Sequence, residues 1–170
     1  LLHEWLPGRS LSEVLLSNND TVSLEAVGKA LARLHLKRRA KLHARPMETV
    51  MNALKKLPAD SQFLGQRVST KLQSLLKDCV ATLKNYDSDS TVIHGDFHPG
   101  QVIVDQDGNV AFIDLDHAAI GDRHHDLGRF ISHVELLVLY GKLTNVDARR
   151  CMDSFLNGYQ TEGVAVGDRI

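Results

Sequence analysis

The stretch His94-Gly95-Asp96-Phe97-His98-Pro99-Gly100-Gln101 organises this chain of 170 residues. Asp96 comes at the end of one β-like run, and a second carboxylate, Asp114, comes at the end of another. Between them, Gln106-Asp107-Gly108-Asn109 contains an Asp-Gly pair, which predicts a tight hairpin. Because a tight hairpin brings its ends together, we expect both carboxylates in one neighbourhood. Carboxylates grouped with a glutamine and histidines can bind a divalent cation and accept a proton from a hydroxyl, as phosphoryl transfer requires.

Composition places the chain among single-domain globular proteins, with 43% hydrophobic and 24% charged residues. A net charge of −1 gives no general attraction to nucleic acid or to an anionic membrane, so we expect neither as a partner. No stretch approaches the roughly 18 apolar residues of a membrane span. Cys79 and Cys151 lie in helix-like segments, and we expect buried free thiols in a reducing, cytoplasmic compartment.

Apolar residues at helical spacing predict that most of the chain is α-helical. We expect helices over residues 10–17, 23–43, 46–57, 60–86 and 124–141 and a last one from Thr144 or Asn145 to residue 159, strands over residues 1–6, 91–94, 102–105 and 110–113, and a loop over residues 118–122. Ser10-Leu11-Ser12-Glu13 has the spacing of a capping box, and Pro58 is expected to end the third helix. The predicted fold class is α+β, mostly α-helical, with a small central β-hairpin region that carries the two carboxylates.

Two of the expected helices have a clear apolar face. The helix over residues 23–43 presents Leu24, Val27, Leu31 and Leu34, and the helix over residues 60–86 is expected to point Leu64, Val68, Leu72, Leu75, Leu76, Val80 and Leu83 inward. A basic cluster follows the first of these faces: Lys37, Arg38, Arg39, Lys41 and Arg45. It could bind nucleic acid or phosphate, or complement a helix C-terminus and face water. The absence of interleaved aromatic residues favours the solvent-facing alternative.

Three separated elements together resemble the aminoglycoside phosphotransferase and choline kinase-like family, whose members have a protein-kinase-like fold. The elements are residues 94–101, Phe112-Ile113-Asp114, and Gly121-Asp122-x3-Asp126-Leu127, and their order and spacing make the resemblance specific. Residues 1–8 resemble the hinge of that fold, and Ala32-Arg33-Leu34-His35 resembles its "LA-x-LH" helix end. The resemblance implies a single C-terminal lobe over residues 1–170 that begins at the hinge, lacks the N-terminal ATP-gripping lobe, and is truncated at its C-terminus as well.

The resemblance also assigns roles to the residues of the central motif. Asp96 corresponds to the catalytic base, and Asp114 to the magnesium-binding aspartate at the β- and γ-phosphates. Gln101 stands where the family usually has a metal-binding Asn; its amide oxygen can bind the same metal from a side chain one methylene longer. His94 and Asp126 correspond to residues that support the catalytic loop.

The remaining implied contacts are less well defined. The hinge backbone near Glu4 and Leu6 is expected to pair with adenine. Asp116 is either a second metal or substrate contact or a cap of its own loop. A zinc site built on the histidines near His94 is a further alternative, which the Pro- and Gly-containing spacing to His98 does not favour.

The implied activity is ATP-dependent transfer of the γ-phosphate to a hydroxyl of a sugar, an amino alcohol or an aminoglycoside, with ATP and Mg²⁺ as cofactors. The expected partners are that small-molecule acceptor and the protein's own N-terminal lobe, without which we expect this chain to be inactive. Gln101 favours a sugar acceptor modestly. Two other classes stay open: a pseudokinase or non-catalytic ligand-binding module, and a metal-dependent phosphoesterase. A protein kinase is disfavoured because Gly95 replaces the Arg of a His-Arg-Asp loop.

Overall fold

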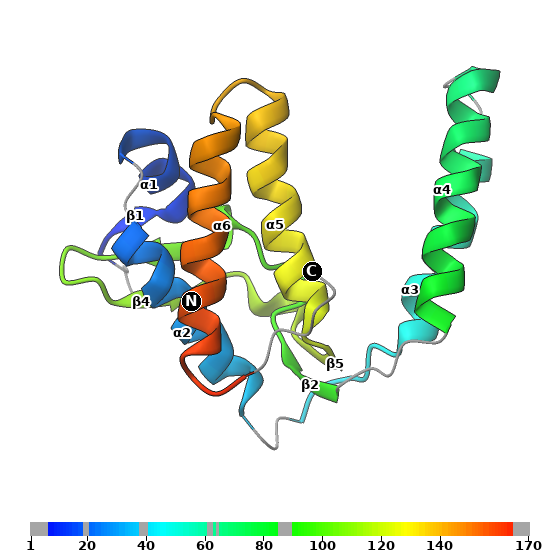
Figure 1. Ribbon diagram of the computed structural model, residues 1–170. Helices are drawn as coiled ribbons and strands as arrows, with labels where there is room; N and C mark the ends of the chain where they lie inside the picture. The colour runs from blue at the N-terminus through cyan, green and yellow to red at the C-terminus, as the bar shows by residue number, and fades with distance from the viewer. Residues whose placement is uncertain are drawn as a thin grey trace, which may run out of the picture.

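The computed structural model describes residues 7–18, 21–37, 41–60, 63, 65–84 and 90–164. Helices account for most of these residues (Figure 1). The helices are α1 (Leu11–Asn18), α2 (Thr21–His35), α3 (Met47–Asp60), α4 (Gln66–Lys84), α5 (His124–Leu139) and α6 (Asn145–Gln160), and the strands are β1 (Arg9–Ser10), β2 (Ser90–Ile93), β3 (Val102–Val104), β4 (Val110–Phe112) and β5 (Ala119–Asp122). The predicted α+β class, mostly helical, is confirmed.

The strands form two small antiparallel sheets rather than one. The first has the order β1-β3-β4, and the predicted hairpin joins β3 to β4 with Val102 opposite Phe112. The second pairs β2 with β5, with Ser90 opposite Asp122. The prediction of a loop over residues 118–122 is therefore wrong. These residues form strand β5, because they hydrogen-bond to β2, which lies some thirty residues earlier in the sequence. A non-local partner of this kind leaves no signal in a four-residue segment.

The hydrophobic core lies among α1, α2, α5, α6 and the hairpin sheet. Its fully buried large side chains include Leu24, Leu31, Phe97, Phe130 and Phe155, with the Phe130 and Phe155 rings stacked 4.0 Å apart. Helices α2 and α6 pack closely because a Cβ atom at Gly28 or Gly158 would collide with backbone of the other helix. Thr144 caps α6 as predicted, since its hydroxyl accepts a hydrogen bond from Asp147 N at 3.1 Å.

Helix α2 ends at His35, eight residues before the predicted end at His43. Further along the chain, residues 43–45 pair with β5: Ile120 N donates to His43 O at 2.9 Å, and Arg45 N donates to Ile120 O at 2.7 Å. This pairing satisfies backbone groups that a longer helix would otherwise have bonded internally. Arg45 is half-buried, so the prediction that the basic cluster faces water is wrong for this residue. Arg38 and Arg39 lie outside the described residues.

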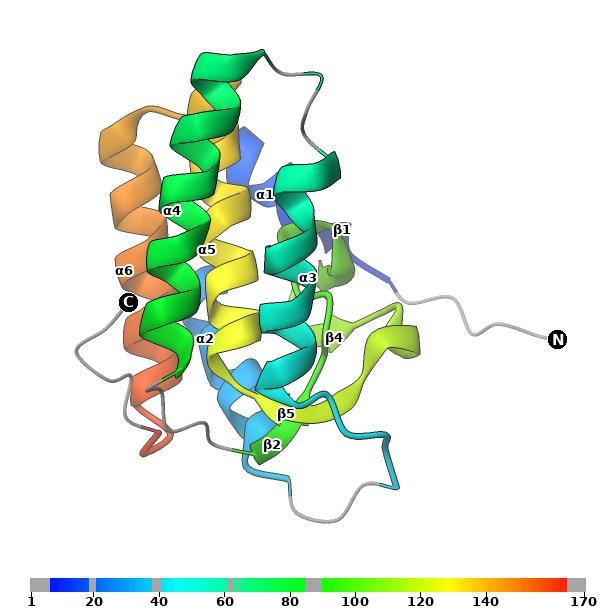
Figure 2. The ribbon, with the colours of Figure 1, turned by 90° about the vertical axis from the view of Figure 1, so that its right-hand side faces the viewer.

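Helices α3 and α4 pack against each other at one side of the molecule (Figures 1 and 2). Helix α3 continues past Pro58, contrary to prediction. None of the described residues of α4 is buried, and Val68 and Leu75 are each more than half exposed. The prediction of an inward-facing α4 is therefore wrong, because this helix has α3 as its main neighbour. Cys79 on α4 is likewise exposed, whereas Cys151 on α6 is buried as predicted.

Among the described residues, no helix is both long and apolar enough to cross a membrane.

Candidate active site

The loop over residues 94–101 connects β2 to β3 at the centre of the molecule. Gly95 has φ of 84°, and a Cβ atom there would collide with the carbonyl oxygen of His117, so the turn requires glycine. At the far end, His98 Nδ1 accepts a hydrogen bond from Gly100 N at 3.1 Å and caps a short turn over Pro99–Gln101. The loop therefore has a defined path on both sides of Asp96.

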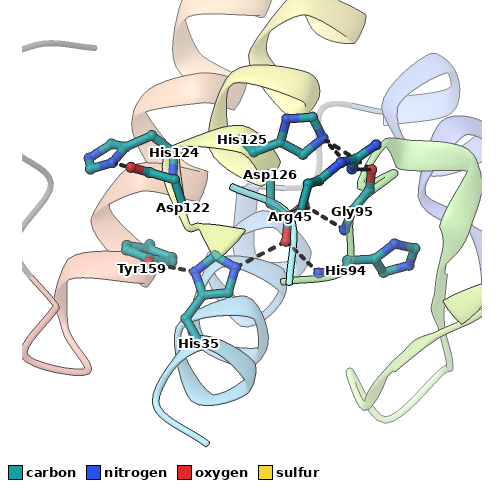
Figure 3. Close-up of polar contacts among 9 residues, drawn as sticks. All are labelled: His35, Arg45, His94, Gly95, Asp122, His124, His125, Asp126 and Tyr159. Atoms are coloured by element: carbon teal, nitrogen blue, oxygen red, sulfur yellow. Dashed lines mark hydrogen bonds and ion pairs between the residues drawn. The ribbon is translucent and has the colours of Figure 1, made fainter. Parts of the chain in front are cut away.

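Asp126, in the first turn of α5, holds the start of this loop (Figure 3). Its carboxylate accepts hydrogen bonds from His94 N at 2.7 Å and Gly95 N at 2.9 Å, the contact expected from the sequence. His94 in turn bonds Ile113 O through Nε2 at 3.0 Å, which ties the loop to the residue before Asp114. Both Asp126 and His94 are fully buried, so these contacts are shielded from water.

A second pair of side chains completes the surroundings of Asp126. His35 Nε2 lies 3.1 Å from Asp126 Oδ2, and His35 Nδ1 lies 2.7 Å from the Tyr159 hydroxyl (Figure 3). With Nε2 donating to the carboxylate, a neutral His35 ring accepts from Tyr159 at Nδ1. Three N–H donors thus compensate the burial of the carboxylate. The "LA-x-LH" resemblance pointed to His35, but no sequence signal identified Tyr159, which lies 124 residues away.

The carbonyl oxygen of Gly95 is held as firmly as its nitrogen. Arg45 Nη1 donates to it at 2.8 Å, and His125 Nε2 lies 3.1 Å from it (Figure 3). The expected helix over residues 124–141 places His124 and His125 at its start. His124 does open α5, but His125 is half-buried and bonds the loop. No local sequence pattern predicts these contacts, because Arg45, Gly95 and His125 lie in three segments that are far apart in the sequence.

The predicted reactive side chains lie on the exposed side of this framework. Asp96 forms an ion pair with Arg129 of α5 through Oδ1 and Nη2. Gln101 Nε2 donates a hydrogen bond to Asp114 Oδ2 at 2.9 Å, so the two predicted metal ligands do meet. Asp114 has φ of 57°, the one left-handed non-glycine residue among those described, and Asp116 follows it, exposed. A strained residue at this position is typical of a functional site.

His98 lies in the same loop, between Asp96 and Gln101 in the sequence. Its ring stacks on that of His133 at 4.6 Å and 11°. Burial lowers the pKa of His98, the His133 and His94 imidazoles lower it further, and the Asp114 carboxylate opposes the shift. The adenine contacts predicted at Glu4 and Leu6 lie outside the described residues.

The family model of the phosphotransferase enzyme family (APH) matches residues 1–154. The chain belongs to this family. The family membership predicted from the three motif elements is therefore confirmed. No curated protein sequence matches the chain.

Solved structures place this phosphotransferase-family chain in the kinase-like fold. It is similar to aminoglycoside-3'-phosphotransferase of type VIII, with 22% identity and a TM-score of 0.67 over 97% of this chain and 62% of that one. It is also similar to amicoumacin kinase hAmiN in complex with AMP-PNP, Ca²⁺ and Ami, with 18% identity and a TM-score of 0.67 over 94% of this chain and 48% of that one. Choline kinase LicA from Streptococcus pneumoniae matches with 16% identity and a TM-score of 0.56 over 96% of this chain and 51% of that one. At these identities the likeness shows the fold, and the chain spans about half to three fifths of these relatives.

The side chains of Gln101 and Asp114 fit a hard divalent cation. The Asp114 carboxylate and the Gln101 amide are oxygen donors of the kind that Mg²⁺ prefers. In this structure the amide presents its NH₂ to Asp114, and turning the amide by half a rotation presents its oxygen instead. Across the described ranges, no three His, Cys, Asp or Glu side chains gather as a metal site of their own.

Proposed function

We propose that the protein containing this chain is an ATP-dependent phosphotransferase that acts on a hydroxyl of a small molecule. One observation carries the proposal: the buried Asp126 fixes the backbone immediately before Asp96, while Gln101 and Asp114 meet at 2.9 Å at the end of the same loop. Phosphoryl transfer needs from this lobe a base on an anchored loop and a metal-binding pair beside the end of that loop.

Each residue then has one task. Asp96 accepts the proton of the acceptor hydroxyl. The hydroxyl oxygen bonds to the γ-phosphorus of ATP while the bond between that phosphorus and ADP breaks. Asp114 and Gln101 would hold Mg²⁺, which neutralises phosphate charge when bound. His94 and Asp126 keep the loop in place, so the nucleophile is aligned without reorganisation during the reaction. Asp116, exposed beside Asp114, is available to the acceptor or to a second cation.

The proposal also covers the nucleotide. We assign adenine to the hinge backbone near Glu4 and Leu6, and we place the phosphate-covering glycine-rich turn and its lysine in an N-terminal lobe of the full-length protein. This chain alone is then expected to be inactive. Measurable ATP turnover by the 170-residue chain, abolished by Asp96→Asn, would contradict that assignment. A cytoplasmic location would supply the ATP.

We assign the acceptor to a cavity of about 560 Å³ whose lining includes Ile93, the residue before the loop, but no residue of the loop itself. It lies between the start of α3 and the start of α5, and its lining includes Arg45 and His125, the two residues bound to the Gly95 carbonyl. Met47 and Ile131 add apolar surface. A sugar, an amino alcohol or an aminoglycoside ring is of a size that such a cavity can accept.

A non-catalytic nucleotide-binding module is the second candidate, and one observation favours it. The Gln101 amide donates its N–H to Asp114, so the pair satisfies itself without a cation. In that case Mg²⁺ would not strengthen nucleotide binding.

One experiment separates the two functions. The full-length protein is incubated with ATP, Mg²⁺ and a panel of sugars, amino alcohols and aminoglycosides, with ADP release as readout and nucleotide affinity measured with and without Mg²⁺. A phosphotransferase releases ADP with one acceptor class and binds nucleotide more tightly with Mg²⁺. No ADP release with any acceptor, together with Mg²⁺-independent nucleotide binding, would contradict the proposal. Asp153→Asn on the exposed face of α6 is the matched control for Asp114→Asn, which should remove the Mg²⁺ effect.

A further inference from the structure

Helix α5 contacts the catalytic loop in two different ways. Asp126 binds the loop backbone, whereas Arg129, one turn further on, forms an ion pair with the side chain of Asp96. Residues three positions apart lie on the same face of a helix, so one helix face reaches both the support and the base. Arg129 therefore touches the carboxylate to which the proposed function assigns the proton.

We propose that Arg129 is a positioning residue that selects which oxygen of Asp96 takes the proton. This inference rests on the proposed function of Asp96. The Arg129 guanidinium occupies Oδ1, which leaves Oδ2 for the acceptor hydroxyl. An aspartate carboxylate otherwise rotates freely about its last torsion, because that torsion has broad wells. A planar guanidinium restricts this rotation better than a point charge would.

The helix around Arg129 is rigid enough for this task. Phe130, the next residue, is fully buried in the core, as is Leu127 one turn earlier. The carbonyl oxygen of Arg129 lies 3.0 Å from His133 Nδ1, and the His133 ring stacks on His98 of the catalytic loop. The backbone of Arg129 is therefore connected, through His133, to the same loop that its guanidinium contacts.

The solvent exposure of the Arg129–Asp96 pair argues for a role in orienting Asp96 rather than in stabilising the fold. The side chains of Arg129 and Asp96 are 43% and 26% exposed, so water screens the pair and it adds little to folding stability. The loop backbone is already held by Asp126, Arg45 and His125. Removing the guanidinium should leave the fold and the nucleotide site intact and disturb the orientation of one carboxylate.

The test compares Arg129→Gln, Arg129→Lys and the control Arg149→Gln, an exposed arginine of α6, in the full-length protein with its best acceptor. We expect Arg129→Gln to lower kcat by about ten- to a hundredfold while KM for ATP changes less than about twofold. Arg129→Lys should recover part of the loss, and Arg149→Gln should match wild type. Unchanged kcat in Arg129→Gln would overturn the proposal, as would equal losses in both Arg129 variants together with a lowered Tm.

A second readout does not depend on turnover. In a crystal structure of the Arg129→Gln protein, the Asp96 carboxylate should adopt a changed or multiple orientation, whereas a single unchanged orientation would overturn the inference. If wild-type protein releases no ADP with any acceptor, the proposed function fails, and this structural comparison still decides whether Arg129 orients Asp96.

Discussion

His35 Nε2 lies 3.1 Å from Oδ2 of Asp126, and both side chains are almost completely buried. The same oxygen accepts the backbone N–H of His94, so one buried carboxylate oxygen joins helix α2 to the catalytic loop. The Asp126 carboxylate is therefore the structural centre of the site, although it touches neither nucleotide nor acceptor in the proposed reaction. Removing its charge should cost stability first and activity as a consequence.

Asp126→Asn should destabilise the protein by at least about 1–3 kcal/mol, because it leaves buried N–H donors without an acceptor. Asparagine keeps one acceptor oxygen but turns an NH₂ group toward N–H donors of His94, Gly95 or His35. Urea unfolding measures the loss, and Asp153→Asn on exposed α6 surface should change stability by less than about 0.5 kcal/mol. Equal stability of the two variants would mean that the buried hydrogen bonds do not hold the loop.

Tyr159→Phe removes the hydroxyl that bonds His35 Nδ1 at 2.7 Å. We expect a loss of about 0.5–1.5 kcal/mol, because a buried imidazole nitrogen loses its partner while the ring still packs. Thermal unfolding should show no such loss for Tyr140→Phe, whose ring is 71% exposed. If His35→Gln and Tyr159→Phe are additive in a double-mutant cycle, the two side chains are not coupled.

Gly95→Ala tests the close approach at the head of the loop. Gly108 in the hairpin turn is the matched control, because its φ of 79° resembles the 84° of Gly95 but a Cβ atom there meets no neighbouring atom. Gly108→Ala should cost about 1–2 kcal/mol for the left-handed backbone alone. Gly95→Ala should cost at least about 1 kcal/mol more, since its Cβ also collides with His117 O. Similar losses in chemical denaturation would contradict this account of the turn.

The stability of the protein should depend on His98 in weakly acidic solution. Burial and the stacked His133 ring lower the pKa of His98 in the folded state, so between that value and the ordinary 6.5 the unfolded chain binds more protons. The stability that this group contributes is thus fully present above about pH 6.5. It is lost as the pH falls from there through the lowered pKa of His98 in the folded state. The Tm of His98→Asn should fall less between pH 7 and pH 5 than that of wild type; parallel curves would contradict the shift.

The sequence predicted the contacts around residues 94–101 better than the surrounding strands and helix ends. The Asp-Gly turn is a local signal for the hairpin, which brings Gln101 and Asp114 together, whereas the Asp126 contacts were expected only from the family resemblance. Strand β5 and the early end of α2 depend on pairing between distant segments, which local propensity does not encode.

Contacts that cross the fold escaped prediction for the same reason. Arg45 looked like one charge of a solvent-facing cluster, and His125 like a helix-opening residue, yet both bind Gly95 O. The apolar stripe of α4 has the right helical period, but periodicity states only which face is apolar. It does not state that another element covers that face.

The central claim is that Asp96 accepts the proton of the acceptor hydroxyl. The most direct test measures ADP release by the full-length protein, wild type and Asp96→Asn, at saturating ATP, Mg²⁺ and acceptor, with ATP affinity measured in parallel. We predict that Asp96→Asn lowers kcat by at least about a hundredfold and leaves the ATP dissociation constant within about twofold of wild type. ADP release at the wild-type rate by Asp96→Asn would contradict the account.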